Sequence, residues 1–379
     1  MTKARSSVFA RVMPFCAFAC FGCSPSSTAP AAARTSPAAT QVRAVLSYTL
    51  DPSFPKAAGV SFNTVSWVER DANTKLIYVL QRSTPPVSAW TPSGTLVSAW
   101  ATQSLGDPHS LSFHANADAS TSVWITDMAP PLLAGQGYGH CLKQFTLTGN
   151  PTSTIGTCAE NSQGTGLSPV QFDEVTDIAW SRQGALLVSD GDLHGLNNRV
   201  LELAPTGAVL ANWSAPGDQP GSGPGQFNLP HALVVDRCER VWIADALNHR
   251  VQVLGTDGTY HGSLTSFGEL GVYALEFGAS FSAPAEAVLF VGASPTTGGG
   301  TGRVSLFAVP MNCAQLDIAA LSPFAQFQVP IPASTSMTLL HSLTVDPETW
   351  DVYVAVLGGN LPPQKWVASW LGKPRPSAH

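Results

Sequence analysis

A recurring pattern of four short apolar runs is the feature that most constrains how this chain can fold. The most regular copy covers residues 221–268, GSGPGQFNLPHALVVDRCERVWIADALNHRVQVLGTDGTYHGSLTSFG, and its runs are separated by turn residues. The copy before it begins QFDEVTDIAW and keeps the same order of runs, with an insertion around His194. Four more diverged copies begin FNTVSW, HSLSF, VYALEF and HSLTVD. The chain therefore contains six copies of one supersecondary unit.

Each copy resembles an NHL repeat, a unit that forms one blade of a β-propeller. The resemblance implies an all-β protein, a six-bladed propeller that we place at residues 42–372. The last copy offers only three strands and ends in KWVASWLG. The early run VRAVLSYTL, residues 42–50, can supply the fourth strand, so we expect an N-terminal strand to close the ring.

Histidine recurs at one register position of the repeat, in DPHSLSF, LPHALVVD and LLHSLTVD. Counting back two residues from the central apolar position gives six equivalent residues: Asn63, His109, Thr176, His231, Tyr273 and His341. The first strand of a blade is the innermost, so these residues should lie around the central channel. The histidines stand on alternate blades, about a third of a turn apart, and three converging imidazoles with a fourth position open are typical of catalytic zinc. The alternative is that they only form hydrogen bonds along the channel.

The N-terminus predicts export. Three cationic residues precede the apolar stretch MPFCAFACFGC, which has the length of a signal-peptide core and is too short to span a membrane as a helix. We assign residues 1–23 to a signal peptide and 24–41 to a Ser/Pro/Ala-rich linker. The segment resembles a lipoprotein signal with Cys23 as the lipidated residue, but lipidation of Cys20 or ordinary cleavage remains open. The expected location is the cell envelope or the exterior, with contact to a membrane only through such an anchor.

Four further cysteines follow, an even number that suits disulfides in an oxidising compartment. Cys141 and Cys158 flank two neighbouring strand-like runs, so a bridge between them is geometrically reasonable, and Cys238 and Cys313 are then left as a second pair. Four buried free thiols are the alternative.

Charge excludes one class of partner. The formal net charge is −6 over 379 residues, and no stripe of Lys and Arg is present, so we do not expect the protein to bind nucleic acid. We expect a monomer that acts on a peptide or a small amide.

The run from Phe62 to about Gly372 resembles the lyase domain of the peptidylglycine α-amidating enzymes, a six-bladed propeller with a three-histidine zinc site. DPHSLSF with VWITDM, VTDIAW with LLVSDG, and GPGQFNLPHALVVD with VWIADALNHRVQV match that domain in order. The resemblance implies that zinc is bound by His109, His231 and His341. It also implies that Arg82, at the end of LIYVLQR, binds the carboxylate of the substrate.

The reaction of that family splits a peptidyl-α-hydroxyglycine into a peptide amide and glyoxylate. Zinc favours loss of the hydroxyl proton, and a nearby base accepts it. The family places a tyrosine directly after the SDG of the third blade, whereas this chain has Asp192 there. Asp192 is our candidate for the catalytic base, with His194 and Tyr273 as alternatives. The family's calcium site uses an aspartate after the last histidine, and because Ser342 stands there we do not expect calcium.

Two interpretations follow. The first is an exported zinc-dependent lyase of the amidating type. The alternative is a non-catalytic NHL-type propeller that binds a protein or peptide at the cell surface. The missing tyrosine favours the alternative, and the alternating histidines favour the lyase.

Overall fold

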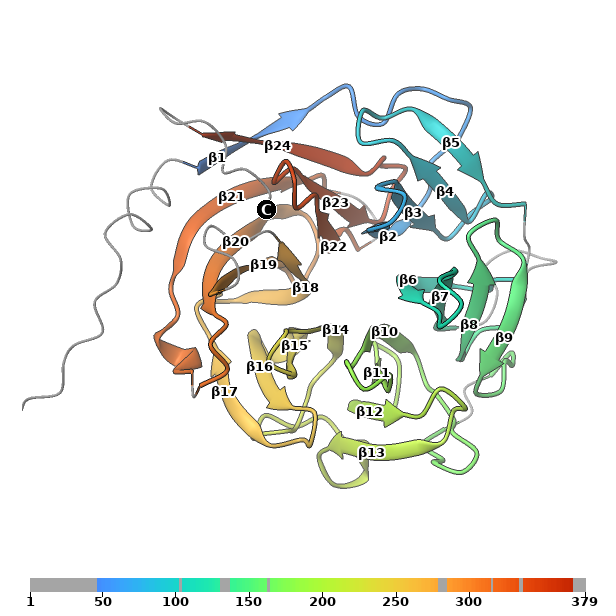
Figure 1. The fold of residues 1–379 in the computed structure, drawn as a ribbon, viewed down its shortest axis with the longest axis vertical. Helices are drawn as coiled ribbons and strands as arrows, with labels where there is room; N and C mark the ends of the chain where they lie inside the picture. The colour runs from blue at the N-terminus through green and yellow to red at the C-terminus, as the bar shows by residue number, and fades with distance from the viewer. Residues whose placement is uncertain are drawn as a thin grey trace, which may run out of the picture.

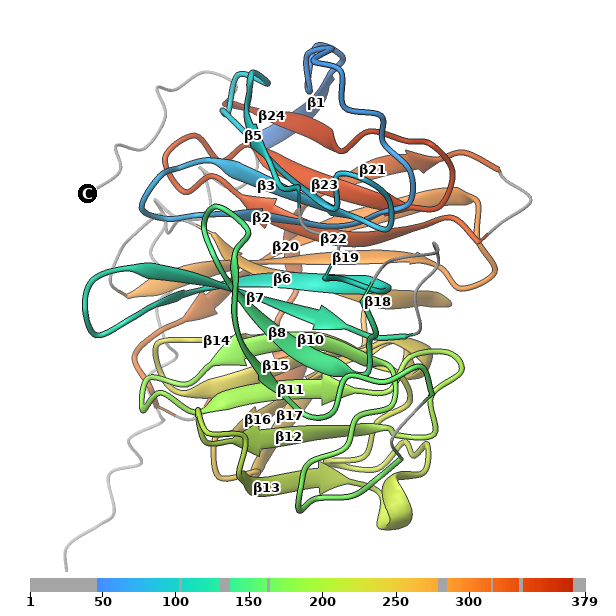
Figure 2. The same cartoon turned by 90° about the vertical axis from the view of Figure 1, so that its right-hand side faces the viewer.

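Six four-stranded antiparallel sheets are arranged in a ring, as the prediction of an all-β six-bladed propeller requires (Figures 1 and 2). The computed structural model describes residues 46–101, 104–129, 137–161, 164–278, 285–314, 316–333 and 337–370. The predicted signal peptide (1–23) and linker (24–41) lie outside these residues. Within the described part of the chain, no helix is both long enough and apolar enough to cross a membrane.

The blades follow one another in chain order, and the first strand of each lies nearest the centre of the ring (Figure 1). Blade 1 comprises β2 (Val65–Arg70), β3 (Ile77–Gln81), β4 (Val87–Trp90) and β5 (Leu96–Ala99). Blade 2 comprises β6 (Pro108–Ala115), β7 (Thr121–Asp127), β8 (Cys141–Thr146) and β9 (Pro151–Ile155). Blade 3 comprises β10 (Val175–Trp180), β11 (Leu186–Asp190), β12 (Arg199–Leu203) and β13 (Val209–Ser214).

Blades 4 to 6 have the same plan. Blade 4 comprises β14 (Pro230–Val235), β15 (Arg240–Asp245), β16 (Arg250–Gly255) and β17 (Tyr260–Leu264). Blade 5 comprises β18 (Leu270–Gly278), β19 (Glu286–Pro295), β20 (Gly300–Pro310) and β21 (Pro323–Ile331). Blade 6 comprises β22 (Leu339–Val345), β23 (Val352–Leu357), β24 (Gln364–Trp370) and β1 (Leu46–Asp51). Short 3₁₀ helices lie at Pro216–Asp218, Ala246–Asn248 and Ile318–Ala320.

The N-terminal strand closes the ring, as predicted. β1 pairs antiparallel with β24, from Leu46 opposite Trp370 to Asp51 opposite Lys365, and so becomes the outermost strand of blade 6. Because this sheet is assembled from both ends of the propeller, its pairing holds the first and last blades in one ring.

Burial explains the sequence pattern of the strands. Second strands such as β3 and β15 are buried at every residue, because neighbouring blades cover both of their faces. Outer strands contact a neighbour on one face only, and β21 alternates between buried and exposed residues over its C-terminal half. The core therefore consists of apolar layers between blades; one of these joins Leu187 and Val200 of blade 3 to Leu233 and Ile243 of blade 4.

Blades 2, 3 and 4 share a buried ion pair between the last residue of the second strand and a cation on the third strand. The pairs are Asp127 with Lys143 at 2.6 Å, Asp190 with Arg199 at 2.9 Å, and Asp245 with Arg250 at 2.7 Å. In blade 2 the Asp127 carboxylate also accepts hydrogen bonds from the backbone N–H groups of Gly106 and Asp107, both 2.7 Å long. The ion pair thereby fixes the loop that leads into the innermost strand.

Both expected disulfides are present, so the alternative of four free thiols is wrong. Cys141–Cys158 joins residues of blade 2 that are 17 positions apart. Cys238–Cys313 spans 75 positions and links the turn between β14 and β15 to the segment after β20, which connects blades 4 and 5.

Replacing both Cys238 and Cys313 by serine should lower the free energy of unfolding by about 4 kcal/mol, because the bond closes a long loop in the unfolded chain. The same change at Cys141 and Cys158 should cost about 3 kcal/mol, since that loop is shorter. Urea unfolding of the two double variants tests this order. A larger loss for the Cys141/Cys158 variant would contradict it.

Candidate metal centre

A β-bulge interrupts the innermost strand of every blade at the repeated register position. At this position the pairing between the first and second strands shifts in register. The extra residue is left unpaired, so its side chain does not follow the regular alternation between the two faces of the sheet. The bulged residues in blades 1 to 6 are Ser66, His109, Thr176, His231 with Ala232, Tyr273, and His341. The sequence assignment is therefore right in five blades. In blade 1 the equivalent residue is Ser66, and the assignment of Asn63 is wrong. Val65 and Val68 are both buried, and the count started from Val65, whereas Val68 is the central apolar position.

The three histidines meet on the axis of the ring. Their ring centroids are 4.4 to 4.7 Å apart, and each residue is at most 2% exposed. One nitrogen from each of His109, His231 and His341 lies within 4.8 Å of the other two. The structure thus brings together the residues that the sequence pattern selected, and they can hold a metal ion.

Each imidazole is oriented by a hydrogen bond to the next blade. Nδ1 of His109 lies 2.7 Å from the carbonyl oxygen of Thr176, and Nδ1 of His231 lies 2.6 Å from that of Tyr273. Nδ1 of His341 lies 2.6 Å from the carbonyl oxygen of Ser66. A carbonyl only accepts, so each Nδ1 carries the proton and each Nε2 keeps a lone pair. The acceptor carbonyls are at the bulges of blades 1, 3 and 5, between the histidine-bearing blades.

The cluster has the properties of a ligand set for a transition metal. Nε2 of His231 and Nε2 of His341 are 3.1 Å apart, although each tautomer presents a lone pair, and Nε2 of His109 has no hydrogen-bond partner. Burial, with the neighbouring His109, lowers the pKa of His231 to about 3, and burial holds the pKa of His341 well below its usual value. Neutral lone pairs at such distances repel unless a cation lies between them, and imidazole suits zinc, copper, iron and nickel.

Asp192 lies beside this cluster, directly after the end of β11. Its Oδ2 is 3.5 Å from Nε2 of His109. Burial opposes ionisation of Asp192, but attractive interactions, to which the charge of Arg82 contributes, outweigh it and hold the pKa of Asp192 below its usual value. The loop that follows is held by hydrogen bonds from the backbone of His194 to Glu174 and of Leu196 to Asp173. Asp192 is therefore presented from an anchored loop.

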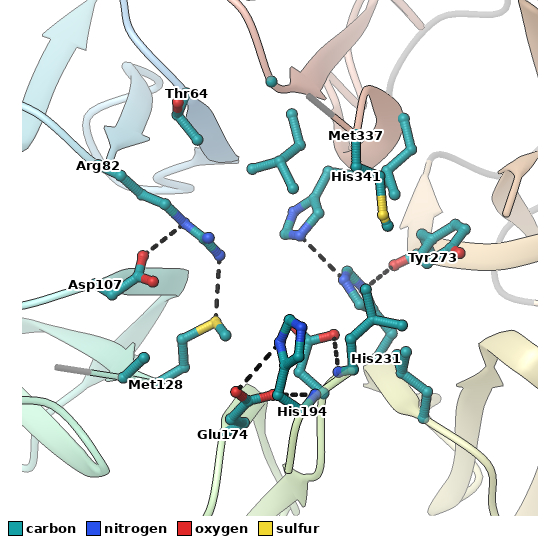
Figure 3. A pocket seen from close by; sticks show the side chains of 17 residues that line it. Thr64, Arg82, Asp107, Met128, Glu174, His194, His231, Tyr273, Met337 and His341 are labelled. Atoms are coloured by element: carbon teal, nitrogen blue, oxygen red, sulfur yellow. Dashed lines mark hydrogen bonds and ion pairs between the residues drawn. The ribbon is translucent and has the colours of Figure 1, made fainter. Parts of the chain in front are cut away.

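Arg82 follows β3 and points into the same cavity (Figure 3). Its Nε lies 2.8 Å from Oδ1 of Asp107, and its Nη2 lies 3.2 Å from Sδ of Met128. Asp107 belongs to the loop that Asp127 fixes. The guanidinium is thus oriented by a chain of buried polar contacts that begins at the ion pair of blade 2.

The cavity at this mouth of the channel has a volume of about 370 Å³. Its charged side contains Arg82, Asp107, Asp192 and Glu174, and His231 and His341 form part of its lining. The opposite wall is apolar and consists of Leu229, Tyr273, Met337, Leu339 and Leu357, from blades 4 to 6.

The three residues considered as a base are placed differently. Asp192 is the one in contact with a cluster histidine through a carboxylate oxygen. The side chain of His194 is 85% exposed and lies 3.7 Å from Glu174. Tyr273 packs edge-on against His231 with ring centroids 5.1 Å apart. The hydroxyl of Ser342 accepts a hydrogen bond from the backbone N–H of Val68.

Sequence reasoning missed Asp107 and Trp67. Asp107 precedes the histidine in DPHSLSF, and that carboxylate on the loop into the channel was an available signal. Trp67 lies with its ring centroid 6.2, 6.5 and 6.2 Å from those of His109, His231 and His341. A tryptophan in an apolar run gave no sign of this position.

No family model matches the chain. Among curated proteins, NHL repeat-containing protein 3 of Homo sapiens is 31% identical over 320 residues, which cover 82% of each chain. The Mus musculus protein of the same name is 31% identical over 316 residues with the same coverage. The chain belongs to the NHL repeat-containing protein 3 family.

This NHL repeat-containing chain also resembles a peptidylglycine alpha-amidating monooxygenase. The Rattus norvegicus protein is 30% identical over 152 residues, which are 40% of this chain and 14% of that protein. Among solved structures, one described as a streptogramin B lyase aligns with 86% of this chain, at 11% identity and a TM-score of 0.49.

Adding a transition metal to chelator-treated protein should raise the melting temperature, because a ligand that binds only the folded state stabilises it. At 100 times the dissociation constant the gain is about 2.7 kcal/mol. We expect this shift with zinc in the wild-type NHL repeat-containing protein and no shift in His341→Ala, each compared with its own metal-free sample. An equal shift in both would contradict the assignment.

Proposed function

We propose that this chain is a zinc-dependent lyase that cleaves the C–N bond of a peptidyl-α-hydroxyglycine to give a peptide amide and glyoxylate. The observation that carries the proposal is a cluster of three histidines, of which His231 and His341 line the same cavity as Arg82 and Asp192. The partial resemblance to the peptidylglycine alpha-amidating monooxygenase of Rattus norvegicus supports a role in peptide amidation.

The histidine cluster is suited to zinc. Its three neutral nitrogens match the ligand number of catalytic zinc sites, which leave one position open. When bound, zinc supplies Lewis acidity that favours loss of a proton from a hydroxyl group. The carbonyls of Ser66, Thr176 and Tyr273 keep each ring in the tautomer that donates its lone pair.

Arg82 binds the carboxylate of the substrate in this proposal. Its side chain is only 13% exposed, and the ion pair to Asp107 is made through Nε. That geometry directs the terminal nitrogens of the guanidinium toward the cavity, where they can donate to a carboxylate (Figure 3). The ion pair with Asp107 and the contact of Nη2 with Sδ of Met128 hold the guanidinium at this cavity before substrate binds.

Asp192 accepts the hydroxyl proton. Loss of that proton lets the hydroxyl oxygen form a carbonyl, and the electrons of the C–N bond pass to nitrogen, which takes up the proton from Asp192 and leaves as the amide. The carboxylate lies at the cavity and within 3.5 Å of a cluster nitrogen, so a hydroxyl group bound at the cluster lies within its reach.

The apolar wall of the cavity accommodates the peptide portion of the substrate. Leu229, Leu339 and Tyr273 are at most 3% exposed and pack on one another, so the wall is rigid. A cavity of about 370 Å³ encloses a hydroxyglycine and part of the preceding residue, and the rest of a peptide extends from the mouth.

We also propose that the protein works outside the cytoplasm, as a secreted monomer or through a lipid anchor. Two disulfides support this, because such bonds persist in oxidising compartments.

The zinc-loaded protein should release glyoxylate from a peptide ending in α-hydroxyglycine and not from the same peptide ending in glycine. A coupled assay with glyoxylate reductase measures this directly. Tight binding of both peptides with no glyoxylate would overturn the lyase and leave a peptide-binding propeller.

Replacing Arg82 by methionine should raise KM about 10- to 100-fold, since hydrogen bonds to charged groups contribute about 1.5 to 3 kcal/mol. Arg82→Lys keeps the charge and should recover part of the loss. Steady-state kinetics with a substrate whose carboxylate is amidated provides the control, because its KM should be insensitive to both changes.

Replacing Asp192 by asparagine should lower kcat about 10²- to 10⁴-fold with little change in metal content. The neighbouring change Leu193→Ala is the matched control and should leave kcat within a few-fold of the wild type. Unchanged kcat in Asp192→Asn would remove Asp192 from the role of base.

A further inference from the structure

A second cavity, of about 270 Å³, lies on the channel and is lined by residues of the innermost strands of blades 1 to 5. Three carboxyl groups line it, Glu69, Asp177 and Glu276, from blades 1, 3 and 5. None of the described residues that line it is a lysine, arginine or histidine. Its lining shares no residue with that of the cavity around Arg82.

Trp67 separates this carboxyl cavity from the histidines. Its indole lines the carboxyl cavity, and its centroid is 6.2 to 6.5 Å from all three imidazole centroids. The indole is nearly equally distant from the three imidazole rings, which are grouped around the axis. It therefore lies close to that axis, on one side of the histidine cluster. His231 and His341 line the Arg82 cavity, which identifies the other side as the open one.

The position of Trp67 follows from the bulge in β2. Ser66 is the bulged residue, and its carbonyl accepts the hydrogen bond from His341. The next residue in the chain is Trp67, which is 5% exposed. One local distortion of the backbone therefore supplies both a carbonyl that orients a histidine and an indole that covers the cluster.

We propose that Trp67 is a positioning residue that seals the inner side of the metal centre. The indole keeps the three imidazoles converging and blocks the path between the cluster and the carboxyl cavity. Metal and substrate then enter and leave through the Arg82 mouth alone. Without the indole, the cluster opens toward the cavity that Glu69, Asp177 and Glu276 line, and the metal gains a second route of escape.

The test is the rate of metal loss from cobalt-loaded or zinc-loaded protein mixed with excess chelator, followed by stopped-flow absorbance. We expect Trp67→Leu to increase the rate constant at least tenfold, because the aliphatic side chain no longer covers the cluster. Trp67→Phe retains a ring and should stay within about threefold of the wild type. Both variants keep an apolar side chain at this buried position, and a melting curve of each checks that the fold is retained.

Trp180→Leu is the matched control. Trp180 lines the same carboxyl cavity but stacks on His114, with centroids 3.6 Å apart, and has no contact with the cluster among those that the structure defines. Its replacement should leave the rate of metal loss unchanged. Equal acceleration in Trp180→Leu and Trp67→Leu, or no acceleration in Trp67→Leu, would overturn the proposal. So would a wild-type protein that binds no metal. Because the readout is metal loss, the proposal stands or falls independently of glyoxylate release.

Discussion

Three hydrogen bonds across blade boundaries connect the fold of this protein to its candidate site. In each, an imidazole Nδ1 on an even-numbered blade contacts a bulge carbonyl on the next odd-numbered blade, at 2.6 to 2.7 Å. The last of the three runs from His341 to Ser66, across the same boundary that β1 helps to close. The bonds join six blades in alternating pairs and at the same time fix which nitrogen of each histidine is protonated. The histidine cluster is therefore a consequence of how the blades meet.

A second set of polar contacts leads from the scaffold to the cavity that Arg82 lines. The ion pair between Asp127 and Lys143 is one of three that repeat in blades 2 to 4, where they fix the loop into the innermost strand. In blade 2 this loop contains Asp107, which holds Arg82 of blade 1. A structural feature of the repeat thus positions a guanidinium at the cavity. The corresponding loops of the other blades have no arginine partner at this mouth among the described lining residues.

Much of the fold could be predicted because the same pattern of apolar runs occurs six times in the sequence. The four apolar runs in each copy predicted the six blades. The short final copy, together with the additional N-terminal run, predicted the closing strand. His109, His231 and His341 could be found because they share one register position. Ser66 could not, because a bulge adds one residue to the count and two buried valines offered competing frames. The three carbonyl groups that accept hydrogen bonds from the histidines could not be predicted either. Every residue has a backbone carbonyl, and only the packing of the blades determines which three lie next to an imidazole. Trp67 reaches the axis through the same bulge and gives no separate signal in the sequence.

The proposed lyase activity depends on a metal ion held by the three histidines. Elemental analysis by mass spectrometry of the purified mature protein, dialysed against a weak chelator, tests this most directly, with His231→Ala measured beside it. We expect about one zinc ion per chain in the wild type and its loss in a folded His231→Ala variant. A folded wild type without a stoichiometric transition metal, or a variant that retains the metal in full, would contradict it.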